Sequence, residues 1–316
     1  MAHKIERIIV VTKKTPLEEL ILRLNSKEQA RFYLEQNLVS FTDYEQAHTQ
    51  YKQAVAHVRQ QLPRALKQQF IDRDFLPTYQ FDEHDLIVTI GPDGLVINTA
   101  KYLTSQPILA LNPDPQRIDG ILIPFTYTEA REWIDLAIQE KAPITAVSMV
   151  KAALNDGQTI YGVNDLFIGA RTHVSARYRI TLGNRSEEQI SSGIIVSTGV
   201  GCTGWLRSIT LGAWQTLHYF HEGKERDREV DLNKLEIGWN SDRLWLAVRE
   251  PFRSKVSQNS LVFAQVHPEE KLVLSSQMPD NGVIFSDGIE SDYLTFNSGS
   301  IAHISLAERK TQMITR

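Results

Sequence analysis

Cysteine is almost absent from the 316-residue sequence, since Cys202 is the only one. A single thiol excludes a disulfide framework and a cysteine-based zinc site, and it makes a reducing compartment the natural expectation. No stretch approaches the ~20 apolar residues of a membrane helix, and the apolar run at residues 8–11 is too short for a signal-peptide core. These absences predict a cytoplasmic protein without a membrane span.

An excess of positive charge is also missing. Lys and Arg number 34 against 38 Asp and Glu, so the net charge of -4 argues against nucleic acid as the main partner. The sequence has no His-Glu-x-x-His metal motif, no Gly-x-x-x-x-Gly-Lys-Ser/Thr phosphate loop and no Gly-x-Ser-x-Gly elbow. With 42% hydrophobic residues, the chain still has enough apolar material for a sizeable core.

The first half of the chain alternates short apolar runs with amphipathic segments. Residues 8–11, 86–90 and 108–111 read as buried parallel strands. A helix opens at Pro16, with helical spacing through Leu20 and Leu24 and later at Phe32 and Leu34, and residues 43–66, 95–103 and 128–140 read as further helices. Thr15 is a good N-cap for the first of these helices, with Pro16 at its first position. Alternating strands and helices predict a doubly wound α/β domain over residues 1–145.

The second half has a different texture. Residues 174–182 alternate apolar and polar side chains, and further strands are predicted at 193–197, 244–248, 271–274, 282–285 and 301–306. One helix is predicted at about 205–220, and the charged run at 224–231 reads as a solvated loop. We therefore expect a β-rich, sandwich-like domain at 146–295, with residues 296–316 returning to the first domain.

The turn at residues 91–94, Gly-Pro-Asp-Gly, follows a predicted strand and precedes a helix. Gly91 and Gly94 would let the backbone approach a phosphate, whose charge a helix N-terminus stabilises. A carboxylate there, Asp93, can orient or deprotonate a hydroxyl. A plain β-turn is the simpler alternative for the tetrapeptide alone. Its place at a strand end, like that of Asn112 in the turn at 112–115, favours a ligand site.

A second candidate loop runs from Ser197 to Trp205 and again joins a strand to a helix. Three glycines within six residues are costly unless the backbone needs unusual angles or something approaches it closely. The hydroxyls of Thr198 and Thr203 are suited to a ribose or phosphate, and Trp205 is suited to stacking on a base. The alternative is a mobile loop followed by a core tryptophan.

Two acidic turns complete the set. The pair Asn164 and Asp165 stands just before an apolar strand, and Asp287 precedes Gly288 in a predicted hairpin turn. Each is common turn chemistry by itself, although an Asn-Asp pair can also bind sugar hydroxyls.

Taken in order, these pieces resemble the NAD kinase family. The family has a Gly-Gly-Asp-Gly turn, an Asn-Glu/Asp pair, a Gly/Thr/Ser-rich loop ending in an aromatic residue and a late Asp-Gly turn. The segments at 111–117, 164–168 and 249–251 look most like the mitochondrial-type branch. The first 80 residues look similar to bacterial NAD kinase-like proteins often called sugar kinases.

The resemblance implies the fold described above, a homodimer or larger homo-oligomer, and transfer of the ATP γ-phosphate to the 2′-hydroxyl of the adenosine ribose of NAD. Asp93 would be the catalytic carboxylate, and Mg²⁺ would bind on the ATP phosphates rather than to protein ligands. ATP would lie near Gly94 and Lys13-Lys14. The nucleotide-binding positions that carry over are Gly91, Gly94, Asn112, Asn164, Asp165, Thr198, Thr203, Trp205 and Asp287.

Three positions depart from the family pattern. Pro92 replaces the second glycine of the turn, which removes an N–H and fixes φ near about -65°. Leu95 stands where Thr is frequent, and Cys202 takes the place of a Ser. Two alternatives therefore stay open beside the NAD kinase reading: a kinase of the same fold acting on a sugar or lipid hydroxyl, and a non-catalytic NAD(P)-binding sensor.

Overall fold

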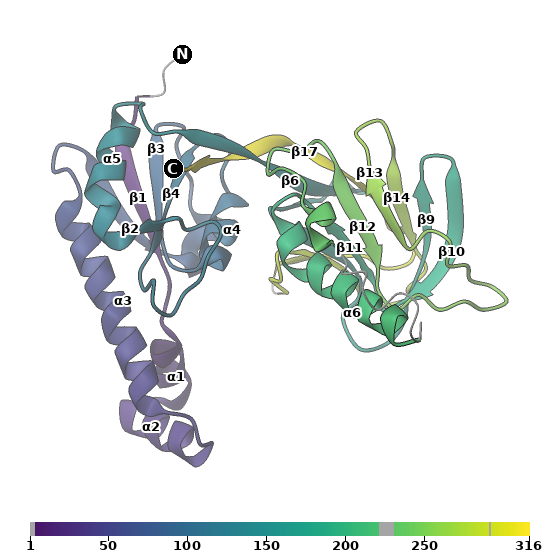
Figure 1. Ribbon diagram of the computed structural model, residues 1–316, viewed down its shortest axis with the longest axis horizontal. Coiled ribbons are helices and arrows are strands. Elements are labelled where there is room, and N and C mark those ends of the chain that lie inside the picture. Colours follow the sequence, from purple (N-terminus) through teal and green to yellow (C-terminus); the bar gives the residue numbers. More distant parts are fainter. Residues whose placement is uncertain (1–3, 221–230, 291) are drawn as a thin grey trace. The chain divides into compact units, whose positions relative to one another are not determined.

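The computed structural model describes residues 4–220, 231–290 and 292–316, and the chain forms two compact units (Figure 1). Unit 1 contains the residues up to Thr145 together with Thr311–Arg316, and unit 2 contains Ala146–Lys310. The solvated loop predicted at 224–231 lies outside the described residues, apart from Asp231. Among the described residues, no helix has the length and apolar character needed to cross a bilayer.

Unit 1 is built on a parallel sheet in the strand order β2-β1-β3-β4. Its strands are β1 (Arg7–Thr12), β2 (Lys67–Asp72), β3 (Asp85–Ile90) and β4 (Pro107–Asn112), with the short β5 (Phe125–Thr126) and the end of β17 also paired to β4. The predicted strands β1, β3 and β4 are almost continuously buried, as expected of a parallel sheet with helices on both faces. Sequence reasoning missed β2 because this edge strand is largely exposed and carries mostly polar residues.

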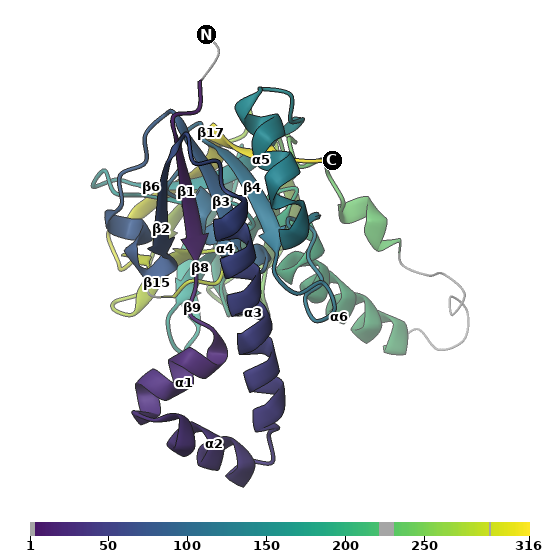
Figure 2. The same ribbon diagram turned by 90° about the vertical axis from the view of Figure 1, so that its left-hand side faces the viewer.

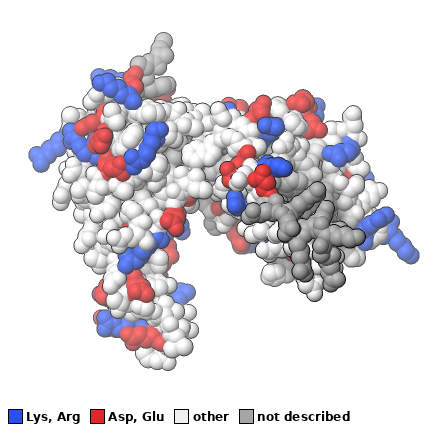
Figure 3. Space-filling view, in the orientation of Figure 1, with Lys and Arg blue, Asp and Glu red and all other residues white. Residues whose placement is uncertain are grey.

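The described residues of unit 1 form five α-helices: α1 (Pro16–Leu24), α2 (Lys27–Gln36), α3 (Phe41–Gln61), α4 (Asp93–Ala100) and α5 (Ala130–Ile138). Thr15 caps α1 through a capping box with Glu18, as its sequence position predicts. The second half of α3 packs with α5 on the sheet through Tyr51 and Val58. Its first half extends past the sheet beside α1 and α2, where acidic and basic side chains are mixed on the surface (Figures 2 and 3).

Unit 2 is a sandwich of two antiparallel layers. One layer contains β6 (Ile144–Leu154), β7 (Thr159–Gly162), β9 (Ala176–Leu182), β10 (Arg185–Ser191), β14 (Leu272–Ser276) and β17 (Ile301–Ile314). The other is a six-stranded sheet in the order β13-β12-β11-β8-β15-β16. Its strands are β8 (Asp165–Ala170), β11 (Ile194–Ser197), β12 (Leu244–Val248), β13 (Phe263–Val266), β15 (Gly282–Ser286) and β16 (Tyr293–Thr295).

The core of unit 2 lies between these layers and draws apolar side chains from both. Helix α6 (Trp205–Phe220) packs on the outer face of the six-stranded sheet through Trp205 and Ile209. The predicted fold class, an α/β domain with a sandwich-like β domain, is confirmed.

The register of the six-stranded sheet brings several predicted motifs to one end of it. β8 begins at Asp165, which pairs with Ser197 at the end of β11. β15 ends at Ser286, which pairs with Leu166. The turns that precede β8 and follow β11 and β15 therefore lie side by side.

Candidate functional site

In unit 1, the candidate site lies at the carboxyl ends of β1 and β3. β1 pairs with β2 on one side and β3 on the other, so the strand order reverses at this point. Ligands of open α/β sheets bind at such switch points. The Tyr51 hydroxyl bridges the two strand ends: it accepts from the Lys13 N–H at 2.9 Å and donates to the Ile90 carbonyl at 3.0 Å.

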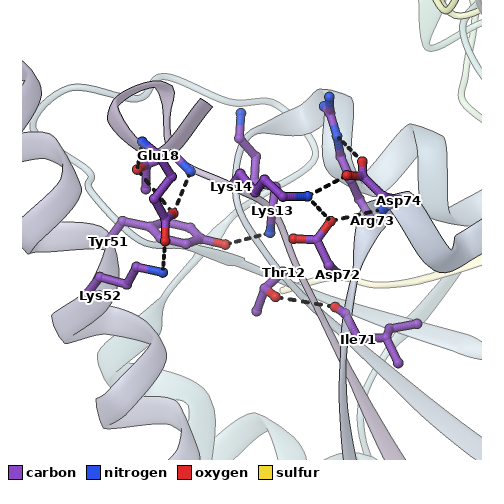
Figure 4. A network of polar contacts seen from close by, with 11 residues as sticks. Thr12, Lys13, Lys14, Glu18, Tyr51, Lys52, Ile71, Asp72, Arg73 and Asp74 are labelled. Carbon is purple, nitrogen blue, oxygen red and sulfur yellow. Dashed lines mark hydrogen bonds and ion pairs between the residues drawn. The ribbon is translucent and has the colours of Figure 1, made fainter. Parts of the chain in front are cut away.

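Two lysines follow β1, and their surroundings differ (Figure 4). The Lys14 ammonium donates to Asp72 and Asp74, and these carboxylates hold the pKa of Lys14 above its ordinary value. Lys13 is about half-buried, and burial together with the nearby Arg73 lowers its pKa. Among the residues described, no carboxylate forms an ion pair with Lys13. Lys13 is therefore the lysine whose charge a bound phosphate would compensate.

The turn at 91–94 continues β3 directly into α4. The Gly91 N–H donates to the Leu111 carbonyl at 3.2 Å, and the Pro92 carbonyl accepts from the Leu95 N–H at 2.8 Å. Pro92 occupies the N-cap position in an extended conformation. The N–H groups of Asp93 and Gly94 stand at the start of the helix, where no acceptor within the helix is available. Two main-chain donors are thus left for an anion despite the proline.

The Asp93 carboxylate is held by the loop that follows β4. Its two oxygens accept from the Ile121 N–H at 2.9 Å and the Leu122 N–H at 3.0 Å. Burial raises the pKa of Asp93, and these two bonds oppose the rise. Since a carboxylate has about four lone-pair positions, each oxygen keeps one for another donor. Asp93 is oriented, half-buried and able to accept a proton.

Gly120 is a residue that sequence reasoning missed. A Cβ built there would lie 2.6 Å from an Asp93 oxygen and 2.3 Å from Ile123 Cγ1. The loop can fold over the carboxylate only because this position has no side chain. The pair Asp119-Gly120 was the available signal, but it resembles any surface turn.

Asn112 has a local role in the structure. Its amide nitrogen donates to the Ile118 carbonyl at 2.8 Å, and its amide oxygen accepts from the Asp114 N–H at 2.9 Å. The side chain is buried. Asn112 therefore shapes the turn after β4, and its predicted contact with a nucleotide stays a prediction.

In unit 2, Asp287 forms hydrogen bonds with the main chain at the start of β8. Its carboxylate accepts from the N–H groups of Val163 at 3.1 Å, Asn164 at 2.7 Å and Asp165 at 3.3 Å. Thr198, which directly follows β11, binds the same segment: its hydroxyl donates to the Val163 carbonyl at 2.5 Å. The Asn164 amide oxygen is buried and has no hydrogen-bond partner among the described residues. Four predicted residues are thus brought together at this end of the sheet.

The glycine-rich loop is explained in part by contacts within the protein. A Cβ at Gly201 would lie 2.1 Å from the Asn164 carbonyl oxygen, and one at Gly199 would lie 2.3 Å from the Gly238 carbonyl oxygen. What approaches these glycines is the protein's own main chain. The Thr203 hydroxyl donates to the Val200 carbonyl at 3.1 Å.

Residues 199–204 also spell Gly-Val-Gly-Cys-Thr-Gly, which has the spacing of a dinucleotide-binding fingerprint. That fingerprint acts in a parallel strand-helix-strand unit. Here β11 is antiparallel to both of its neighbours, β8 and β12. The pattern is therefore not that motif.

Trp205 lines an aromatic pocket on the outer face of the six-stranded sheet. The Phe167 ring stacks on Phe285 at 4.8 Å and on Trp205 at 5.9 Å between centroids. The Arg249 guanidinium lies 5.3 Å from the Trp205 ring. The pocket has a volume of about 740 Å³, and Arg171 also lines it. Its size and stacked rings suit a planar heteroaromatic group.

Among the described residues, no group of three or more His, Cys, Asp or Glu side chains could hold a metal ion. Mg²⁺ can still enter on phosphates, because it keeps several waters and needs few protein ligands.

Comparison with known proteins confirms the resemblance to NAD kinases. The chain is 27% identical over 148 residues to the NAD kinase of Pyrococcus furiosus and 28% identical over 154 residues to that of Thermococcus gammatolerans. Each alignment covers 44% of this chain and 50% of the relative. The chain thus matches about half the length of these curated relatives. No family model matches it.

Solved structures extend the likeness to the fold of nearly the whole chain. An NAD kinase from Archaeoglobus fulgidus in complex with ATP has a TM-score of 0.57 at 15% identity, covering 98% of this chain and 93% of that one. Yeast NADH kinase complexed with NADH has a TM-score of 0.58 at 14% identity, covering 98% and 84%. At these identities the likeness shows the fold.

Proposed function

We propose that the protein is an NAD kinase-like phosphotransferase that transfers the ATP γ-phosphate to the 2′-hydroxyl of the adenosine ribose of NAD. The observation that carries this proposal is Asp93, an oriented and half-buried carboxylate beside the β1–β3 switch point. The two curated sequence relatives are named NAD kinases, and so is a solved structure of similar fold.

Asp93 is proposed to orient the acceptor hydroxyl and to take its proton. The main-chain bonds from Ile121 and Leu122 fix the carboxylate before substrate binds, so little reorganisation is needed in the transition state. Burial raises its pKa toward the range of an effective base. Phosphoryl transfer asks mainly for positioning and charge neutralisation, so one carboxylate and a few cations suffice.

Lys13 and the N–H groups of Asp93 and Gly94 are proposed to bind the phosphates of ATP. Mg²⁺, carried on those phosphates, would neutralise charge during transfer. In unit 2, the segment containing Asn164 and Asp165 is proposed to bind the dinucleotide, and Trp205 to stack on one of its bases. Thr198 and Asp287 are proposed to position this segment, because both form hydrogen bonds with the main chain of residues 163–165.

The direct test is NADP formation from NAD, ATP and Mg²⁺. Asp93→Asn should lower kcat by about 10²–10⁴-fold, the usual contribution of a general base. If wild-type protein binds NAD and forms no NADP with ATP, GTP or polyphosphate, the kinase proposal is wrong. Labelling of another metabolite by ATP would then identify a different acceptor hydroxyl. Stabilisation by NADP without any turnover would identify a sensor.

The two lysines provide a matched pair of variants. Lys13→Met should raise the KM for ATP about tenfold or more, because it removes a charged hydrogen bond to phosphate. Lys14→Met should change that KM little, since Lys14 already pairs with Asp72 and Asp74. Equal effects of both substitutions would contradict the assignment of Lys13.

A homodimer or larger homo-oligomer and a cytoplasmic location complete the proposal. Light scattering during gel filtration measures the oligomer directly. A monomeric mass at micromolar concentration would contradict the first prediction.

A further inference from the structure

Two aspartates, Asp165 and Asp287, lie at the end of the six-stranded sheet where β8 begins and β15 ends, and their surroundings differ. Asp287 accepts three main-chain N–H bonds, from Val163, Asn164 and Asp165. Its own N–H donates to the Asp165 carbonyl at 3.0 Å. The three N–H bonds that the Asp287 carboxyl group accepts favour its ionised form. The negative charge is therefore stabilised on Asp287.

Asp165 has the opposite surroundings. It is only 6% exposed, and within the described residues its carboxyl group receives no hydrogen bond. The charged group that faces it is Asp287. The hydroxyls of Ser197, at the end of β11, and of the next residue, Thr198, already donate to main-chain carbonyls. On β7, the Tyr161 hydroxyl donates to Glu308. Burial, followed by the Asp287 charge, raises the pKa of Asp165 to about 7.

We propose that Asp165 and Asp287 form an acid pair in which Asp287 is the ionised positioning residue and Asp165 is the protonated member that donates a hydrogen bond to the bound dinucleotide. Asp165 would thus recognise an acceptor atom of the ligand rather than a hydroxyl proton. The neighbouring Asn164 amide oxygen, which is buried and has no partner in the part of the chain that the structure describes, supplies the complementary acceptor. This inference rests on the proposed binding of NAD to unit 2.

The first test measures NAD affinity of the full-length protein by calorimetry at about pH 6 and about pH 8.5. With a pKa of about 7, the protonated fraction of Asp165 falls about 30-fold over this range, and wild-type affinity should fall with it. Asp165→Asn keeps a donor and cannot ionise, so its affinity should stay within about threefold across the range. Asp165→Ala should bind about tenfold more weakly than wild type at the lower pH.

Asp287→Asn removes the neighbouring charge and one acceptor. The fall in affinity should then begin at a lower pH than in wild type. Glu187→Gln is the matched control, because Glu187 also holds main-chain N–H groups in unit 2, those of Ser260 and Leu261. It should reduce thermal stability and leave the pH dependence unchanged. A wild-type affinity that is flat or rises with pH overturns the proposal, as does an Asp165→Asn variant that binds no better than Asp165→Ala.

A second measurement needs no ligand, so it separates this inference from the proposed function. The infrared C=O band of a protonated carboxyl group should be present at about pH 6, lost at about pH 8.5, and missing from Asp165→Asn at both values. A band that Asp165→Asn leaves unchanged overturns the acid pair even if NAD binds. If the band behaves as expected and NAD does not bind, the acid pair stands and the proposed ligand is wrong.

Discussion

The burial of Asp165 beside Asp287 leads to a prediction about the stability of the folded protein. The folded protein raises the pKa of this carboxyl group from an ordinary 3.8 to about 7, chiefly because burial disfavours its charge. The folded state therefore binds more protons than the unfolded state between these two values. Unfolding free energy should fall as pH rises through this window, and the loss should be complete above about pH 7.

The size of the effect follows from the two pKa values. A difference of about three pH units at about 1.36 kcal/mol each gives about 4 kcal/mol. Asp165→Asn removes the titrating group and keeps the size of the side chain. Relative to wild type, this variant should gain up to about 4 kcal/mol between about pH 4 and about pH 8.5.

Urea unfolding of both proteins at several pH values measures this difference, and other titrating groups cancel in the subtraction. Asp156→Asn is the control for an Asp-to-Asn change in unit 2, because hydrogen bonds from Gln158 lower the pKa of exposed Asp156. Its difference from wild type should have the opposite sign: Asp156→Asn loses stability at neutral pH and regains it in acid. A pH-independent difference for Asp165→Asn would refute the reasoning.

Three further predictions concern the glycine-rich loop, the turn at 91–94 and the aromatic pocket. Gly201→Ala places a Cβ 2.1 Å from the Asn164 carbonyl oxygen and should destabilise the folded protein by about 2 kcal/mol or more, as measured by thermal unfolding. The control is Gly212→Ala in α6, where a Cβ has open space, and it should stabilise the protein by up to about 1 kcal/mol. Pro92→Gly restores an N–H and should lower the KM for ATP in steady-state kinetics, at a cost of about 0.4–1 kcal/mol in stability; an unchanged KM would show that this N–H does not bind phosphate. Trp205→Ala should weaken NAD binding about tenfold in calorimetry, because it removes a stacking surface. Trp205→Phe should retain most of the affinity for NAD. Equal affinities of the two variants would exclude stacking.

Part of the fold was readable because its signals are local. The Thr15 cap, the buried run of β1 and the alternation of β9 each depend on a few neighbouring residues and on whether one or two faces are covered. The exposed strand β2 escaped detection because its side chains carry no apolar pattern; the parallel partner β1 makes it a strand.

The sequence by itself determined which residues carry the candidate chemistry, because residue types such as Asp93 and the Asn164-Asp165 pair follow strands whose ends can be predicted. Tertiary structure alone decided what each of them does. Among the described residues, it placed two N–H donors on Asp93, three on Asp287 and none on Asp165, and the pKa of Asp165 is raised to about 7. The physical reason is that hydrogen bonds and desolvation come from residues distant in sequence, which no local pattern records.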